Sequence, residues 1–416
     1  MNSKRVVFID QARAIAILLM LIGHSLHRFL GESWKLTEAY RNYQFVRGIS
    51  SALFLMVSGF SFVVASFHHF EDYTVVSERM MGRLRRIALI IFLGSVLHIW
   101  AQTFHLSIES FTPLAYERFL RFDVLQNIAF GLILLHGTLW IARRETRFVW
   151  FALPLTILLF GLAFVTYHKE IDALLPPELA APANLFHFSQ FPVVPYTGYM
   201  FIGALFGYAF WKRRQLGKER TVFMLAIVAA CVMFVLEWYI RNKVEGGIFP
   251  YSGKWPKTPG NTFARAGCAV IIISLLYFLG RVKLFFPKTA FLLSKDALAI
   301  YFAHLPMVYG TRAYPGCFRS RAGLMDPLEV FCWIVFLISL MSAMAFVISW
   351  LRKRYPEFTT ALRRGLIAGA CISFFAWPTL SVLRIVASFL LGGALSFYFH
   401  RYRLRVRREQ GVELKG

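Results

Sequence analysis

Long apolar segments recur along the whole chain and constrain its fold more than any other feature. Of the 416 residues, 57% are hydrophobic and only 16% are charged, whereas soluble domains carry about 25% charged residues. The apolar runs are about 16–25 residues long, which is the length that an α-helix needs to cross a bilayer. A β-barrel would show short segments of alternating hydrophobicity instead. The sequence therefore predicts an all-α, polytopic integral membrane protein, a bundle of transmembrane helices.

The apolar runs predict about twelve membrane helices, within a range of about ten to twelve. They lie at 8–30, 46–67, 85–104, 123–141, 148–167, 193–211, 221–240, 262–280, 290–309, 327–351, 364–380 and 384–400. Pro378 and Arg384 divide the last long apolar stretch into two helices. The first segment is too long for the apolar region of a signal peptide, and no small-residue cleavage motif follows it, so we expect it to be retained.

Basic residues cluster in every second connection and predict the orientation. These clusters span 79–86, 143–147, 212–220, 281–288, 352–364 and the tail 401–416. By the positive-inside rule both termini are expected in the cytoplasm. The net charge of +24 is explained by this topology, and since no RNA-binding motif is present, we expect no nucleic-acid partner.

The chain is expected to form one membrane domain over residues 1–400, followed by a basic cytoplasmic tail at 401–416. No soluble catalytic module is apparent, so any chemistry must come from helices and short loops. None of the five cysteines forms a C-x-x-C pair; Cys317 falls in a loop and the others fall in apolar runs. The sequence therefore predicts neither a disulfide framework nor a metal site.

The opening helix, FIDQARAIAILLMLIGHSLHRFL at 8–30, carries polar groups where they are costly. Arg13 and His24 are eleven residues apart, which places them on nearly the same face, about 16 Å apart along the helix axis. An ionisable residue deep in a membrane is a functional-site candidate. The alternative is a histidine that joins helices by a hydrogen bond.

A basic face opens the segment ERMMGRLRRIALIIF at 78–92. Arg79, Arg83 and Arg86 are spaced i, i+4, i+7 and share one side of a helix. Guanidinium groups bind phosphate oxygens in pairs, so this face suits a phosphate-bearing ligand. Contact with lipid headgroups is the alternative.

Small and amide residues mark three further helices. Gly59 and Gly203, with their small neighbours, favour close helix packing. Gln126 and Asn127 are adjacent amides in an apolar helix, where they could orient a substrate or join helices.

Four polar residues fall toward the outer side of the predicted bundle. Arg47 and Tyr196 could be interface anchors or ligand contacts. Arg265 could pair with Glu237 or line an outer cavity. His304 is a second deep histidine, in a helix for which Ser294 is the expected N-cap.

Together these segments resemble a family. IDQARAIAILLMLIGHSLHRF resembles the opening helix of the transmembrane acyltransferases, in which an Asp-x-Leu-Arg-Gly segment precedes a histidine, here Arg13 and His24. ALFLMVSGFSF is similar to the family's second helix. VLQNIAFGLIL, FPVVPYTGYMFIGALFG and LSKDALAIYFAHLP resemble, in order, three segments of the heparan-α-glucosaminide N-acetyltransferase-like branch, so the similarity extends over 7–310.

The chain departs from that pattern at a few positions. Gln11 and Ala12 stand where the first motif has x-Leu, and Ala14 stands for its Gly. Asn127 occupies a position where the branch usually has Arg. The related acyltransferase-3 family shares the Arg and His pattern, so it stays a second assignment.

The resemblance implies transfer of an acyl group from cytoplasmic acyl-CoA, commonly acetyl-CoA, to a sugar amine or hydroxyl. His24 would act as general base or be acylated itself, and no metal is required. The implied roles are catalytic for Asp10, His24, Gln126 and Asn127, donor-binding for Arg13, Arg79, Arg83 and Arg86, and acceptor-binding for Arg47, Tyr196, Arg265 and His304.

The expected acceptor is an envelope glycan or a lipid-linked saccharide, and the expected location is a bacterial inner membrane. The main rival function is a transporter or flippase for a glycan or acyl intermediate, which would move its substrate without consuming acyl-CoA. A third is a non-catalytic subunit of an envelope assembly. The sequence leaves open whether several copies associate.

Overall fold

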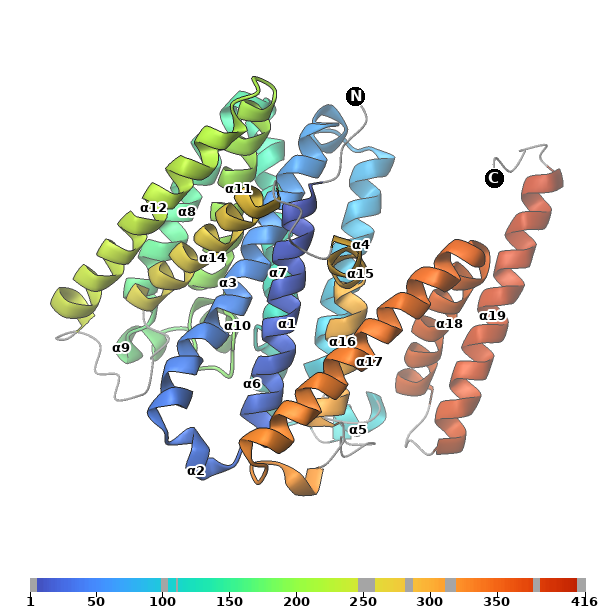
Figure 1. The fold of residues 1–416 in the computed structure, drawn as a ribbon. Helices are drawn as coiled ribbons and strands as arrows, with labels where there is room; N and C mark the ends of the chain where they lie inside the picture. Colours follow the sequence, from blue (N-terminus) through green and yellow to red (C-terminus); the bar gives the residue numbers. More distant parts are fainter. Residues whose placement is uncertain are drawn as a thin grey trace.

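The computed structural model describes residues 6–98, 104–109, 111–245, 259–280, 287–310, 319–376 and 382–409. Within these ranges the chain is built from helices and contains no strand, apart from one isolated bridge between Leu30 and Met325 (Figure 1). The longer helices are α1 (Val7–Phe29), α3 (Glu38–Phe67), α4 (Glu78–His98), α7 (Val124–Ala142), α8 (Phe148–Thr166), α11 (Val193–Arg214), α12 (Glu219–Tyr239), α14 (Pro259–Leu279), α16 (Ala297–Tyr309), α17 (Pro327–Arg354), α18 (Pro356–Phe375) and α19 (Val382–Glu409). The shorter ones are α2 (Glu32–Lys35), α5 (Phe104–Glu109), α6 (Pro113–Leu120), α9 (Lys169–Asp172), α10 (Pro177–Ala183) and α15 (Pro287–Lys295).

Each of the twelve predicted ranges overlaps a helix or a pair of helices among the described residues. Among the described residues, eight helices are long and apolar enough to cross a membrane: α1, α3, α7, α8, α11, α12, α14 and α17. Helices α4, α15 with α16, α18 and α19 occupy the other four ranges. Twelve crossings therefore stay a prediction, and eight candidate spans are established.

Helix α3 begins well before the predicted residue 46. Thr37 caps its N-terminus by accepting a hydrogen bond from the Tyr40 backbone N–H at 3.3 Å, and Glu38 lies in the first turn, where a negative charge is favourable. Arg47 consequently lies inside the helix rather than at its entrance.

The predicted helix at 290–309 is two helices rather than one. α15 ends at Lys295 and α16 begins at Ala297, with Asp296 between them. The Asp296 carboxylate accepts a hydrogen bond from Arg352 of α17 at 2.5 Å. Ser294 is therefore the penultimate residue of α15 and not the N-cap of a longer helix.

Helices α3 and α11 cross at the centre of the bundle, and each contributes a glycine to the point of contact. A Cβ atom on Gly59 would lie 1.8 Å from the carbonyl oxygen of Met200, and a Cβ on Gly203 would lie 1.9 Å from that of Met56. Backbones that approach this closely leave no room for a side chain. The predicted packing role of these two glycines is confirmed.

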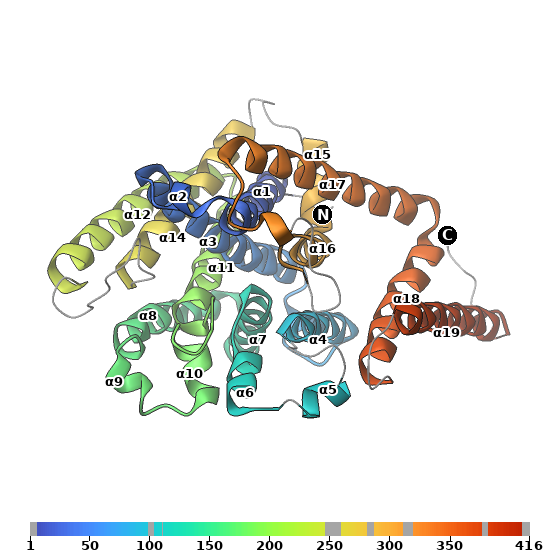
Figure 2. The same cartoon turned by 90° about the horizontal axis from the view of Figure 1, so that it is seen from below.

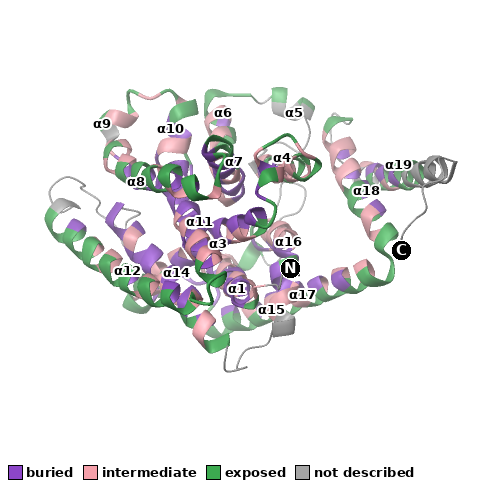
Figure 3. Ribbon diagram, turned by 90° about the horizontal axis from the view of Figure 1, so that it is seen from above, coloured by how far each residue is buried: buried purple, intermediate pink, exposed green. Residues whose placement is uncertain are grey.

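The remaining helices surround this crossing with graded burial (Figure 3). In α11, 78% of the most apolar stretch is buried, against 17% in α12 and 22% in α17. The outer helices thus present apolar side chains away from the protein, as helices in contact with lipid do.

The two ends of the bundle differ in character. The short helices α2, α5, α6, α9 and α10 lie at the lower end in Figure 1, whereas α1 begins and α19 ends toward the upper end. The connection after α11, which follows Lys212, Arg213 and Arg214, also lies at the upper end. This arrangement agrees with both termini lying on one side of a membrane, and the identity of that side stays a prediction.

Helices α18 and α19 form a hairpin that stands beside the bundle (Figure 2). They pack closely on each other, since a Cβ on Gly392 would lie 2.4 Å from the backbone nitrogen of Gly369. The predicted tail at 401–416 begins as a continuation of α19, which ends at Glu409. Residues 410–416 lie outside the described part of the chain.

Candidate functional site

A large cavity lies between α1, α3, α4, α7, α16 and the α18–α19 hairpin. Its volume is about 1430 Å³. Its lining residues include seven Lys or Arg side chains and a single carboxylate, that of Asp123. The cavity therefore offers a strongly positive surface inside a largely apolar bundle.

One end of the cavity, called here the basic end, is built around Arg13. Arg13 Nη1 donates to Ser294 Oγ at 2.8 Å and Arg13 Nη2 donates to Ser61 Oγ at 2.7 Å. Ser294 Oγ in turn donates to Asp10 Oδ1 at 2.7 Å, and Arg13 lies 3.7 Å from the same oxygen. This network fixes the guanidinium between α1, α3 and α15.

Three further cations complete the basic end: Arg83, Arg86 and Lys295 line the cavity with Arg13. Arg83 donates to Ser66 Oγ at 2.6 Å and stacks 4.0 Å from the ring centroid of Tyr73. Four cations around one opening can hold several phosphate oxygens. Arg79 is not on the cavity wall; it pairs with Asp72.

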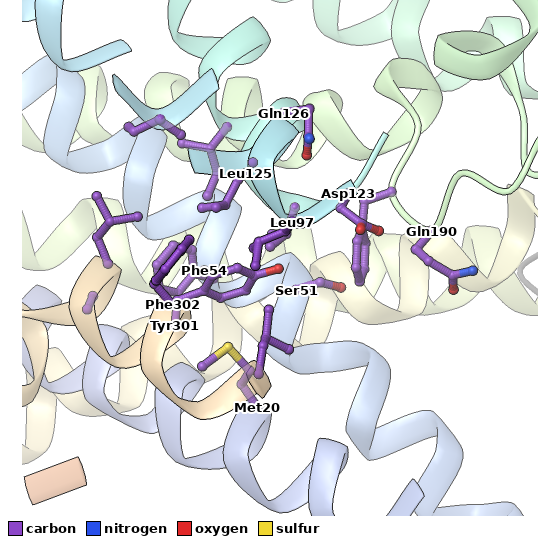
Figure 4. Close-up of a pocket in the computed structure, with 18 of the residues that line it drawn as sticks. Met20, Ser51, Phe54, Leu97, Asp123, Leu125, Gln126, Gln190, Tyr301 and Phe302 are labelled. Atoms are coloured by element: carbon purple, nitrogen blue, oxygen red, sulfur yellow. The ribbon is translucent and has the colours of Figure 1, made fainter. Parts of the chain in front are cut away.

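The middle of the cavity is mainly apolar (Figure 4). Met20 of α1, Phe54 of α3 and Phe302 of α16 gather there, with Leu97 of α4 beside them. The polar side chains of Asp123 and Gln190 lie to one side of this group. A long, uncharged chain would fit this section better than a charged one.

The other end, called here the histidine end, contains His24 of α1. His24 Nδ1 lies 2.8 Å from the hydroxyl of Tyr309. The His304 ring packs against His24 with its centroid 5.2 Å away. His24 and Tyr309 line the cavity, whereas His304 is fully buried behind them, and its Nδ1 donates to the Ile300 carbonyl at 2.9 Å.

Arg47, Tyr196 and Arg265 also line the cavity. Tyr196 is only 1% exposed, so it is not an anchor in an interfacial aromatic belt. The alternative in which Glu237 pairs with Arg265 is wrong, because Glu237 pairs with Arg241 at 3.2 Å.

The two adjacent amides of α7 have different environments. Gln126 lines the cavity and lies against Gly94 of α4. Asn127 is fully buried, and its Nδ2 donates to the carbonyl oxygens of Phe191 and Pro192 at 3.1 and 2.9 Å. Asn127 therefore joins α7 to the start of α11, and the structure does not bring it to the cavity.

Asp10 does not share a reaction centre with His24. The two residues are fourteen positions apart on one helix, which separates them by about 21 Å along the axis. Asp10 instead belongs to the Arg13 network. The structure thus places Asp10 in the Arg13 network at the basic end and does not bring it to His24.

Sequence reasoning missed several residues of this site. Lys295 and Ser294 reach the basic end from the end of α15, and Tyr309 reaches His24 from 285 positions away. Spacing within one helix carries no signal of such contacts. The one available hint was that Ser294, Lys295 and Tyr309 flank the segment that also holds His304.

Within the described residues, no group of three His, Cys, Asp or Glu side chains could hold a metal ion. Cys231, Cys268, Cys332 and Cys371 are free thiols. Cys317, predicted to lie in a loop, falls outside the described residues.

Comparison with known families gives one match. Residues 5–243 match the family model described as heparan-alpha-glucosaminide N-acetyltransferase, catalytic. The matched region includes the opening helix with Arg13 and His24 and continues through α12. No curated protein matches the chain.

Proposed function

The chain belongs to the heparan-alpha-glucosaminide N-acetyltransferase catalytic family, and on that premise we propose that its cavity carries out acetyl transfer between acetyl-CoA and a sugar acceptor. Family membership makes the protein an integral membrane acetyltransferase. The donor, the acceptor and the residues that act on them form the proposal.

One observation carries this proposal: a single cavity joins four cations at one end to His24 at the other. Arg13 and His24 are eleven residues apart on α1, or about 16 Å. The nucleotide phosphates would bind Arg13, Arg83, Arg86 and Lys295. The uncharged pantetheine arm would follow the apolar middle section and present the thioester to His24.

His24 can assist the transfer as a general base. In this step the imidazole removes a proton from the sugar amine or hydroxyl, whose heteroatom attacks the thioester carbonyl. The C–S bond then breaks, and the imidazolium returns its proton to the leaving thiolate. Gln126 could stabilise the oxyanion from the cavity wall. Direct acylation of His24, followed by transfer, uses the same residues.

The acceptor would enter at the histidine end, where Arg47, Tyr196 and Arg265 line the cavity. We assign it to the class of envelope glycans and lipid-linked saccharides, and the location to a bacterial inner membrane. The basic end would face the cytoplasm, in line with the positive-inside rule. Arg79, which pairs with Asp72 away from the cavity wall, has no part in this mechanism.

Release of free thiol tests the proposal. Protein in lipid vesicles is incubated with acetyl-CoA and amino sugars or glycans, and His24→Ala is compared with His69→Ala, a change at an exposed histidine outside the cavity. We expect His24→Ala to lower acceptor-dependent release by about 10²–10⁴-fold and His69→Ala to leave it unchanged. Unaltered release in His24→Ala would remove this residue from the chemistry. Glycan movement without acetyl-CoA consumption would favour the transporter instead.

A further inference from the structure

Asp296 and Arg352 form an ion pair between the α15–α16 junction and α17, and neither residue has a role in the proposed mechanism. Arg352 Nη2 donates to Asp296 Oδ1 at 2.5 Å. The Asp296 side chain is 5% exposed, whereas that of Arg352 is 37% exposed. Asp296 Oδ2 is buried and accepts no hydrogen bond within the described part of the chain. The carboxylate is thus enclosed by protein, and a side chain of another helix neutralises it.

Asp296 lies where α15 passes into α16, directly after two residues of the basic end. Its backbone N–H donates to the Leu292 carbonyl at 3.3 Å, and its own carbonyl accepts from the Ile300 N–H at 3.0 Å. Ser294 belongs to the hydrogen-bond network of the basic end, and Lys295 lines the cavity. A displacement of the Asp296 side chain would therefore be transmitted to two groups beside the proposed phosphate site.

Arg352 continues the inward face of α17. Met341, Ala345 and Ser349 are buried and spaced four residues apart. Arg352 follows Ser349 by three positions, so it lies on the same side of the helix, and α17 packs against α15. The next residue, Lys353, is exposed, as basic residues at a membrane boundary commonly are. Two adjacent cations thus have different surroundings, and Arg352 is the one turned toward the bundle.

We infer that Asp296 and Arg352 are positioning residues for the donor: their ion pair holds the end of α15 where Ser294 and Lys295 meet the basic end. Removal of one partner of a buried ion pair leaves a charge that is costly inside the protein, so the junction would shift. The inference rests on the proposed binding of the donor phosphates and deepens it. It also gives α17, which lies outside the family match at 5–243, a part in the site.

Equilibrium binding of coenzyme A to the full-length protein in detergent, followed by calorimetry, tests the inference. Arg352→Gln should raise the Kd about 10-fold, the order of one lost hydrogen bond to a charged group. Arg352→Lys keeps the charge and should restore most of the affinity. Lys353→Gln removes the adjacent exposed cation and is the matched control, for which we expect the wild-type Kd.

Two further variants separate positioning from loss of structure. Asp296→Asn weakens the pair without burying an unpaired charge, because Arg352 is part-exposed, so it should raise the Kd while thermal unfolding stays unchanged. Asp296→Asn combined with Arg352→Gln removes both charges and should bind coenzyme A more tightly than Arg352→Gln alone.

Steady-state kinetics provide a second readout of the position of the effect. In Arg352→Gln, KM for acetyl-CoA should rise about 10-fold. The value of kcat and the KM for the acceptor should change by less than about twofold, because His24 lies about 16 Å from Arg13 along α1. Equal changes in all three constants would overturn the inference.

Three binding results would also overturn it. One is a wild-type Kd in both Arg352→Gln and Asp296→Asn. Another is an equal loss of affinity in Arg352→Gln and Lys353→Gln, which would assign the effect to the overall charge of this surface. The third is a double variant no better than Arg352→Gln. A failure of the proposed function differs from all of these, because the wild-type protein itself would then bind no coenzyme A.

Discussion

His24 shows what residue spacing reveals and what it does not. The helical period alone places His24 and Arg13 on one face, and both line the same cavity. The groups that contact His24, Tyr309 and His304, come from α16, and no local pattern links them to α1. Asp10, to which the family resemblance gave a catalytic role, lies about 21 Å from His24 along α1 and contacts Ser294 in the Arg13 network.

At this scale we predict that Tyr309→Phe lowers kcat about 2–10-fold. The Tyr309 hydroxyl lies 2.8 Å from His24 Nδ1, and a hydrogen bond of this kind contributes about 0.5–1.5 kcal/mol. Loss of the bond frees the imidazole to rotate away from the acceptor. Acetyl transfer kinetics at saturating acetyl-CoA measure the effect, and Tyr239→Phe, at an exposed tyrosine of α12, is the matched control. A rate equal to that of the control would show that the hydroxyl does not position His24.

At the scale of elements, apolar length was a sufficient guide to where the helices lie, since each membrane helix has to satisfy its own backbone hydrogen bonds. It could not show the break at Asp296, whose carboxylate accepts a hydrogen bond from Arg352 of α17, more than fifty residues away. It also could not place the start of α3. The helix extends from the Thr37 cap through eight residues before position 46, and these residues are mostly polar or aromatic. Tertiary contacts and capping, rather than hydropathy, decide these boundaries.

At the scale of elements we predict that a larger side chain at the crossing of α3 and α11 lowers the stability of the protein. Gly59→Ala should destabilise the protein by about 1–3 kcal/mol, because the new methyl group would meet the Met200 carbonyl, a backbone atom that cannot rotate away. Gly137→Ala in α7 meets nothing within 4 Å and should be neutral or stabilising by up to about 1 kcal/mol. Thermal unfolding in detergent compares the two variants, and equal midpoints would show that the crossing is looser than the structure has it.

At the scale of the whole molecule, α2, α5, α6, α9 and α10 lie at one end of the bundle and the basic connection after α11 lies at the other (Figure 1). The clusters of basic residues in every second connection predicted that alternate connections share one side, and the side of the membrane that each end faces rests on charge alone. The cavity that joins the two ends was not predictable, because its walls come from helices spread along the chain from α1 to α19.

Orientation is open to a labelling test in a background without cysteines. Leu174→Cys lies at an exposed position between α9 and α10, and Lys218→Cys lies at an exposed position between α11 and α12. A thiol reagent that cannot cross membranes should label Leu174→Cys in intact cells and Lys218→Cys only after the membrane is opened. The reverse pattern would invert the assignment and place the basic end outside.

The uninterrupted helix α1 carries both Arg13 and His24, and this has a consequence for donor choice. In the proposed mechanism Arg13 binds the donor phosphates and His24 acts at the thioester, so the single helix α1 would fix the distance between these two groups. This distance would constrain the length of the carrier between its phosphates and its thioester, and it would place no constraint on the acyl group beyond the thioester. Under the proposed mechanism this fixed spacing would select for coenzyme A as the carrier, while discrimination among acyl groups would fall to the cavity walls around His24.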